Sequence, residues 1–158
     1  MTKILNCITI GDEKGIGLEL IFKIWHKHKH KTNTFFILGD YIKISKTLRK
    51  YKYSFKLKSI KKPFDAKKYF NKFLPVINIK TKINECSELN SIKNSFELAK
   101  NNKITAIITL PINKSKIMRI SKNFIDHTEF YKKIDNRDAN MLFYSKKIII
   151  CPMTTHIP

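Results

Sequence analysis

The feature of this sequence that most constrains its fold is the alternation of short apolar runs with longer amphipathic stretches along the whole chain. Residues 3–10 and 104–110 are apolar runs that predict buried strands, and residues 18–28 and 88–101 carry apolar side chains at helical spacing. The run at 104–110 is nearly all apolar, which is typical of a central strand in a parallel sheet. The pattern predicts an α/β domain. Further strands are expected at 35–38, 54–60, 76–79, 141–144 and 148–151, and further helices at 42–51, 65–73, 114–120 and 127–134.

Length and composition fit one structural unit that spans residues 1–158. The sequence contains no internal repeat, low-complexity tract or linker, and its hydrophobic share of 42% suits a folded protein. No run of about 18 apolar residues is present, so no membrane span is predicted. The apolar run after Lys3 contains Asn6 and lacks a small-residue cleavage site, which favours a buried strand over a signal peptide.

The three cysteines indicate a reducing compartment. Cys7, Cys86 and Cys151 are odd in number and far apart, and none belongs to a C-x-x-C pair. We therefore expect reduced thiols that pack as small apolar side chains in a cytoplasmic protein.

The formal net charge of +20 raises the question of a polyanionic partner. Only Arg49, Arg119 and Arg137 are arginines, although arginine is the side chain that best recognises phosphates and bases. The lysines are spread along the chain, with the densest region at residues 43–68. We interpret most of them as solvated, and a lysine-rich nucleic-acid-binding module is kept as the weaker alternative.

Residues 11–19 form a glycine-bearing segment between the first strand and the first helix. Glycine there permits a positive φ and close approach of the backbone to a ligand. The segment does not match a dinucleotide fingerprint, which would need glycine at Leu20, and it lacks the G-K-[ST] of a phosphate-binding P-loop. A site-lining role for this segment and a tight strand-to-helix turn both remain open.

Two further segments place polar residues at the start of expected helices. Asn113 and Lys114 follow the apolar strand 104–110, where they would either meet an anionic substrate or simply start a helix. Asp126 and Glu129 have capping-box spacing, which puts His127 and its neighbour Thr128 beside free backbone N–H donors. Such a position binds phosphate or carboxylate, but a plain helix cap has the same sequence.

Histidines supply the last candidates. His156 belongs to a Thr-Thr-His cluster after the strand 148–151, which we expect to be buried, and it is a candidate metal ligand or base. Because the chain ends in this cluster, at Pro158, we expect a truncated gene or a fragment. His26, His28 and His30 alternate with lysines, and side chains two residues apart do not share a helix face, so we expect a solvated helix end.

Taken together, these segments resemble the family of 4-hydroxythreonine-4-phosphate dehydrogenases. That family carries G-D-P-A-G-I-G-P-E after its first strand, followed in order by P-I-N-K, G-H-T-E-[FL] and T-T-H-[IL]-P. The resemblance covers the whole chain but only about the first half of a family member. The corresponding segments here are residues 11–19, 111–114, 127–130 and 154–158.

The resemblance implies an α/β/α layered, isocitrate/isopropylmalate-dehydrogenase-like fold, here truncated to about its first half without the C-terminal cofactor-binding half. It also implies a homodimer with the active site at the subunit interface. A divalent metal (Zn, Mg or Co) would be held by three histidines. NAD or NADP would oxidise 4-phosphohydroxy-L-threonine, with decarboxylation, in pyridoxal 5'-phosphate biosynthesis.

Carried over by position, the resemblance makes His156 the first metal histidine and His127 and Thr128 substrate-binding residues. The other two metal histidines and most of the phosphate-binding residues would lie outside this chain. Because a catalytic metal needs about three protein ligands, we expect the chain alone to be inactive. Possible site-lining residues are Asp12, Gly15, Gly17, Glu19, Asn113 and Lys114.

The chain departs from the family pattern at Glu13, Lys14, Leu18 and Asp126. Glu13 and Asp126 add negative charge, which should weaken the binding of a phosphorylated acid unless lysines compensate. An inactive fragment, or half of a split enzyme, is therefore the main alternative. If the family reading holds, His127, Thr128 and His156 should converge at one rim of the sheet, together with the segments 11–19 and 113–114.

Overall fold

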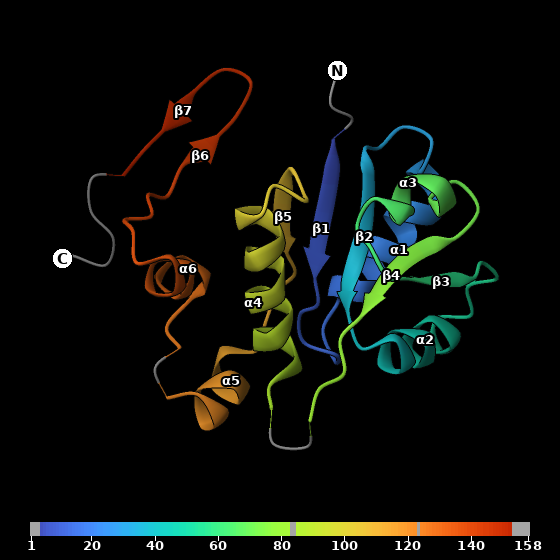
Figure 1. The fold of residues 1–158 in the computed structure, drawn as a ribbon, viewed down its shortest axis with the longest axis horizontal. Coiled ribbons are helices and arrows are strands. Elements are labelled where there is room, and N and C mark those ends of the chain that lie inside the picture. Colours follow the sequence, from blue (N-terminus) through green and yellow to red (C-terminus); the bar gives the residue numbers. More distant parts are fainter. Residues whose placement is uncertain (1–3, 83–84, 123, 153–158) are drawn as a thin grey trace.

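A computed structural model describes residues 4–82, 85–122 and 124–152. Its main feature is a five-stranded parallel sheet with the strand order β3-β4-β2-β1-β5 (Figure 1). The strands are β1 (Leu5–Thr9), β2 (Thr34–Gly39), β3 (Leu57–Ile60), β4 (Leu74–Asn78), β5 (Ala106–Thr109), β6 (Phe143–Tyr144) and β7 (Ile149–Ile150). The helices are α1 (Gly17–His28), α2 (Tyr41–Lys50), α3 (Asp65–Tyr69), α4 (Ser87–Lys100), α5 (Lys114–Ile120) and α6 (His127–Asp135).

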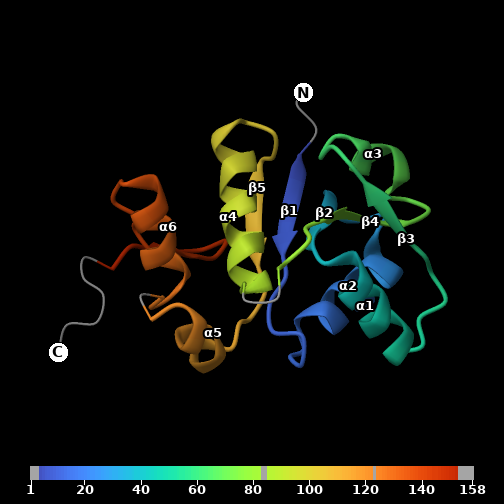
Figure 2. The same cartoon turned by 60° about the horizontal axis from the view of Figure 1, so that its bottom comes forward.

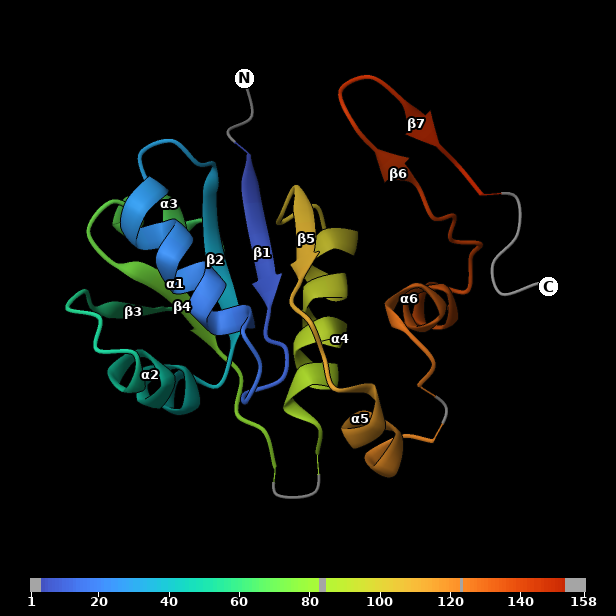
Figure 3. The same cartoon turned by 180° about the vertical axis from the view of Figure 1, so that it is seen from behind.

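Helices cover both faces of the sheet, so the molecule has three layers. One core lies between the sheet and α1 and α2, and Phe22 and Trp25 are its largest fully buried side chains. A second core, around Cys7 and Phe36, lies on the opposite face, where α3 and α4 pack (Figures 1 and 3). The α/β class predicted from the alternating pattern is confirmed, and so is the α/β/α layering that the family resemblance implied. None of the described helices combines the length and apolarity of a membrane span.

β5 lies at the edge of the sheet. It pairs with β1 alone among the described strands, and the side chain of Ile108 is 42% exposed. The prediction of a central strand at residues 104–110 is therefore wrong for the described sheet. Because apolar side chains point to both faces of β5, the sequence indicates that both faces are buried. Among the described elements, α4 packs on one of these faces and the other is open.

The segment after α5 leaves the sheet. Ile117 and Phe124 pack with Cys86, Leu89 and Ile92 in a third, smaller core, which attaches α5 and the start of α6 to α4. β6 and β7 then form a separate antiparallel hairpin (Figure 1).

The hairpin corrects two sequence predictions. Both of its strands are exposed, so the expectation of a buried strand at residues 148–151 is wrong, because nothing among the described residues covers the hairpin. Cys151 is exposed for the same reason, whereas Cys7 and Cys86 are buried as predicted.

Candidate functional site

The glycine-bearing segment and the segment after β5 meet at the carboxyl edge of the sheet (Figure 2). The backbone N–H of Asp12 donates to the carbonyl of Pro111 at 3.0 Å. A Cβ on Gly11 would lie 2.1 Å from that same carbonyl oxygen, and a Cβ on Gly17 would lie 3.1 Å from Cβ of Leu110. The prediction that the segments 11–19 and 113–114 share one rim is confirmed.

The glycines are required here for close approach, not for unusual backbone angles. No glycine in the described chain has a positive φ, so the positive φ allowed for at residues 11–19 is not used. Gly15 closes a turn by donating its N–H to the carbonyl of Asp12 at 3.0 Å, and the Asp12 carboxylate accepts from the N–H of Lys14 at 3.2 Å. Close packing therefore explains both residues: Gly11 lies against the backbone of Pro111, and Gly17 lies against the side chain of Leu110.

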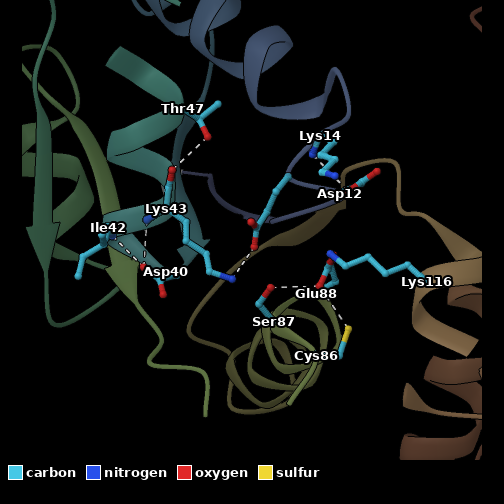
Figure 4. A network of polar contacts seen from close by, with 11 residues as sticks. Asp12, Lys14, Asp40, Ile42, Lys43, Thr47, Cys86, Ser87, Glu88 and Lys116 are labelled. Carbon is cyan, nitrogen blue, oxygen red and sulfur yellow. Dashed lines mark hydrogen bonds and ion pairs between the residues drawn. The ribbon is translucent and has the colours of Figure 1, made fainter. Parts of the chain in front are cut away.

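Ion pairs hold this rim together, and their lysines belong to none of the sequence motifs. Lys43, in α2, pairs with Glu13 at 2.6 Å, so a lysine compensates the negative charge that departs from the family pattern. Lys116, in α5, pairs with Glu88 at 2.8 Å and also lies within electrostatic reach of Asp12. Figure 4 shows Lys43 and Lys116 approaching this part of the rim from α2 and α5.

Glu88 is the buried charge of the network. Its side chain is 2% exposed, and its carboxylate accepts hydrogen bonds from Lys116, Ser87 and Cys86. Burial raises the pKa of Glu88, but the hydrogen bond from Lys116 and the other donors outweigh it and hold the pKa below its usual value. One sequence signal pointed to this residue: an acid one turn before the buried Ile92, on the apolar face of α4.

Two of the candidate residues act in local helix structure. Asn113 caps α5, because its side-chain oxygen accepts from the N–H of Lys116 at 3.0 Å, which is the structural alternative left open for that residue. Glu19 forms an i,i+4 ion pair with Lys23 at 2.6 Å on the outer face of α1. Neither contact identifies a ligand.

The start of α6 has the expected cap. The carboxylate of Asp126 accepts from the N–H of Glu129 at 2.9 Å, which places His127 and Thr128 in the first turn. Nε2 of His127 is buried, and no hydrogen-bond partner is found for it among the described residues. Burial lowers the pKa of His127; Asp126 opposes this effect and Lys114 adds to it. His127 and Lys114 are therefore close enough to interact, and the imidazole is neutral at pH 7.

The remaining histidines divide into two groups. His26, His28 and His30 are exposed at the end of α1, as predicted, and the ring of His26 stacks on Phe55. His156 lies outside the described residues, so its convergence with His127 and Thr128 stays a prediction. Within the described ranges no three His, Cys, Asp or Glu side chains form a group that would hold a metal.

A hollow of about 750 Å³ lies elsewhere, beside α6. It is open and lined by Lys122, Lys132, Lys133 and Arg137 together with two acids. None of Asp12, Asn113 or His127 lines it, so we place the candidate site at the carboxyl edge of the sheet and not in this hollow.

Known proteins match the chain in sequence and in fold. The model of the family described as pyridoxal phosphate biosynthetic protein PdxA matches residues 31–158. The 4-hydroxythreonine-4-phosphate dehydrogenase of Aquifex aeolicus is 30% identical over 96% of this chain and 49% of its own length, and that of Zymomonas mobilis is 27% identical over 96% and 48%. The chain thus spans about half the length of the curated relatives it matches.

The fold agrees with this match. A crystal structure of a 4-hydroxythreonine-4-phosphate dehydrogenase from Burkholderia phymatum superposes with a TM-score of 0.84 at 22% identity, over 100% of this chain and 52% of that one. A structure of a putative 4-hydroxythreonine-4-phosphate dehydrogenase from Salmonella typhimurium gives a TM-score of 0.81 over 99% and 53%. On the strength of the sequence match over residues 31–158, the chain belongs to the PdxA family of pyridoxal phosphate biosynthetic proteins.

Proposed function

We propose that this chain supplies the N-terminal part of the active site of a 4-hydroxythreonine-4-phosphate dehydrogenase. The proposed reaction is the oxidation of 4-phosphohydroxy-L-threonine by NAD or NADP, followed by decarboxylation, in pyridoxal 5'-phosphate biosynthesis. Family membership and the names of the curated relatives support the reaction class. The main alternative is an inactive fragment or one half of a split enzyme, in which the same surface binds ligand without turnover.

The observation that carries the proposal is the first turn of α6. The imidazole of His127 is neutral, its Nε2 has no hydrogen-bond partner among the described residues, and it lies beside Thr128 in the first turn of the helix, with Lys114 near. Helix starts attract anions, and a neutral imidazole can hydrogen-bond a hydroxyl or carboxylate. We assign to His127 and Thr128 the holding of the anionic substrate, with Lys114 contributing positive charge.

A divalent metal would act as a Lewis acid that makes the substrate alcohol more acidic. The described residues do not offer the roughly three protein ligands that a catalytic metal needs. In our proposal His156 is one ligand and the others come from outside this chain, as does most of the nicotinamide cofactor site. The proposal includes assembly as a homodimer. We assign to the described residues the binding of substrate and not the binding of the metal.

We expect the purified chain to bind 4-phosphohydroxy-L-threonine without turning it over. Loss of a hydrogen bond to a charged ligand is worth roughly 1.5–3 kcal/mol, so His127→Ala should weaken binding by about 10- to 150-fold in calorimetric titration. His28→Ala, at the exposed end of α1, is the matched control and should leave binding unchanged. Equal affinity for the two variants would contradict the proposed site, and NAD-dependent turnover lost on His156→Ala would contradict the expected inactivity.

The positive charge leads to a separate expectation for polyanions. Any binding of DNA or RNA should be non-specific, because exposed lysines occur on all six helices of the described chain. For about six phosphate contacts the affinity should fall on the order of 10³-fold between 50 and 200 mM salt. Fluorescence anisotropy with two unrelated duplexes measures this fall. A preference for one sequence that persists at physiological salt would instead favour the nucleic-acid-binding module.

A further inference from the structure

The segment that carries His127 is held to the body of the fold through α4. α5 and α6 follow β5, the last strand of the five-stranded sheet, and leave the sheet behind. Two features join α5 to α4, namely the small third core and the ion pair between Lys116 and Glu88. The position of the His127 imidazole therefore depends on how α5 and the start of α6 lie on α4.

The ion pair fixes α5 in direction as well as in distance. Nζ of Lys116 donates to Oε1 of Glu88 at 2.8 Å, whereas Ser87 and Cys86 donate to Oε2, so both carboxylate oxygens are used (Figure 4). Apolar side chains can shift against one another at little cost, but a buried carboxylate that loses its cation is left with an uncompensated charge. The pair therefore favours one position of α5 on α4 over the neighbouring ones.

A continuous series of contacts runs from this pair to His127. Ile117, the neighbour of Lys116, is fully buried in the third core together with Phe124. The carbonyl of Ile117 accepts from the N–H of Ser121 at 2.8 Å, and the carbonyl of Ser121 accepts from the N–H of Phe124 at 3.1 Å. The ring of Phe124 then meets the imidazole of His127 edge to face, with 6.2 Å between the ring centroids. A shift of α5 would therefore move the aromatic ring that packs against this imidazole.

The same helix places a cation beside the imidazole. Lys114 precedes Lys116 by two residues, and it lies close enough to His127 to lower the pKa of that side chain. The side chain of Asn113 accepts from the N–H of Lys116 at 3.0 Å and so closes the first turn of α5 around Lys114. Fixing Lys116 on α4 therefore also fixes the distance between Lys114 and the imidazole.

We propose that Glu88 and Lys116 are positioning residues for His127. Their ion pair fixes α5 on α4 and so keeps Lys114 and Phe124 in place around the imidazole. Neither residue is assigned a contact with substrate, because Glu88 is buried and holds the ammonium of Lys116. The consequence for ligand affinity rests on the function proposed above, whereas the arrangement around His127 is a property of the fold.

The test is the pKa of His127, measured by NMR in the whole chain, with its resonance assigned by its loss in His127→Ala. In Lys116→Met and in Glu88→Gln, α5 should loosen, Lys114 should move away and water should reach the imidazole. Burial and Lys114 both lower this pKa, so it should rise toward its ordinary value in the two variants. Affinity for 4-phosphohydroxy-L-threonine should fall roughly tenfold in calorimetric titration.

Two comparisons separate positioning from a general loss of stability. Lys116→Arg keeps a cation opposite Glu88, so the pKa of His127 should stay close to that of the unmodified chain. Leu48→Ala truncates a buried side chain in the core beneath α1 and α2. It should destabilise the fold on the other face of the sheet and leave the pKa of His127 unchanged. Heteronuclear NMR spectra check that each variant is folded.

The proposal is overturned if Lys116→Met and Glu88→Gln leave the pKa of His127 unchanged, or if Leu48→Ala raises it equally. It is also overturned if Lys116→Arg raises the pKa as much as Lys116→Met does. A chain that does not bind 4-phosphohydroxy-L-threonine would contradict the proposed function. A raised pKa of His127 in the two variants would support the positioning role even then.

Discussion

Replacing Lys116 by methionine is expected to lower the free energy of unfolding by about 3 kcal/mol at neutral pH. Removing one partner of a buried ion pair costs roughly 3–5 kcal/mol, and the lower end applies because the Lys116 side chain is 43% exposed. Methionine keeps the length of the side chain but leaves the Glu88 carboxylate buried, with Ser87 and Cys86 as its remaining side-chain donors among the described residues. Urea denaturation of the two proteins measures the difference.

The pH dependence identifies Glu88 as the cause. In the native protein the pKa of Glu88 is lowered, so its contribution to stability is present above the unfolded pKa and is lost as the pH falls through the folded pKa. In Lys116→Met the cation is gone, burial dominates, and the pKa of Glu88 rises. In the folded variant, Glu88 therefore takes up a proton at a higher pH than it does in the unmodified protein. The difference in the free energy of unfolding between the two proteins should shrink as the pH is lowered toward about 4.

Lys72→Met is the matched control, because Lys72 is exposed and forms no ion pair with the described residues. It should change stability by no more than about 0.5 kcal/mol. Equal losses for the two variants, or a loss at Lys116 that is the same at both pH values, would show that the Glu88 pair does not stabilise the fold.

Replacing Gly11 by alanine should also destabilise the protein strongly. The new Cβ would lie 2.1 Å from the carbonyl oxygen of Pro111, and a backbone oxygen cannot move aside as a flexible side chain can. Overpacking costs roughly 1–3 kcal/mol, and we expect the upper end of that range, with a fall in melting temperature of about 6–12 °C. The backbone hydrogen bond from Asp12 to Pro111 should weaken as well, which hydrogen exchange of the Asp12 amide would report.

Gly15→Ala tests whether the effect is specific to that contact. Gly15 lies four residues along the same segment, but the nearest atom to its new Cβ would be 3.3 Å away, and its φ is not positive. The melting temperature of this variant should stay close to that of the native protein. If Gly11→Ala melts at the same temperature as Gly15→Ala, the two segments at the carboxyl edge do not depend on close backbone packing.

The sequence by itself determined the local structure and much of the rim. The helix at 114–120 was predicted with its observed bounds, and the helix predicted at 18–28 is observed at Gly17–His28, because periodicity and capping act over a few neighbouring residues. The shared rim of the segments 11–19 and 113–114 followed from the rule that parallel strands end at one edge.

Only the tertiary structure decided which distant groups meet. Glu88 and Lys116 are 28 residues apart, and nothing in local spacing pairs them. The position of β5 at the edge could not be predicted, because the apolar composition of a strand indicates that it will be buried but does not indicate which element buries it. Whether a glycine serves for conformation or for close approach is likewise settled by the neighbouring segment, here Pro111 against Gly11, which only the folded chain brings into contact.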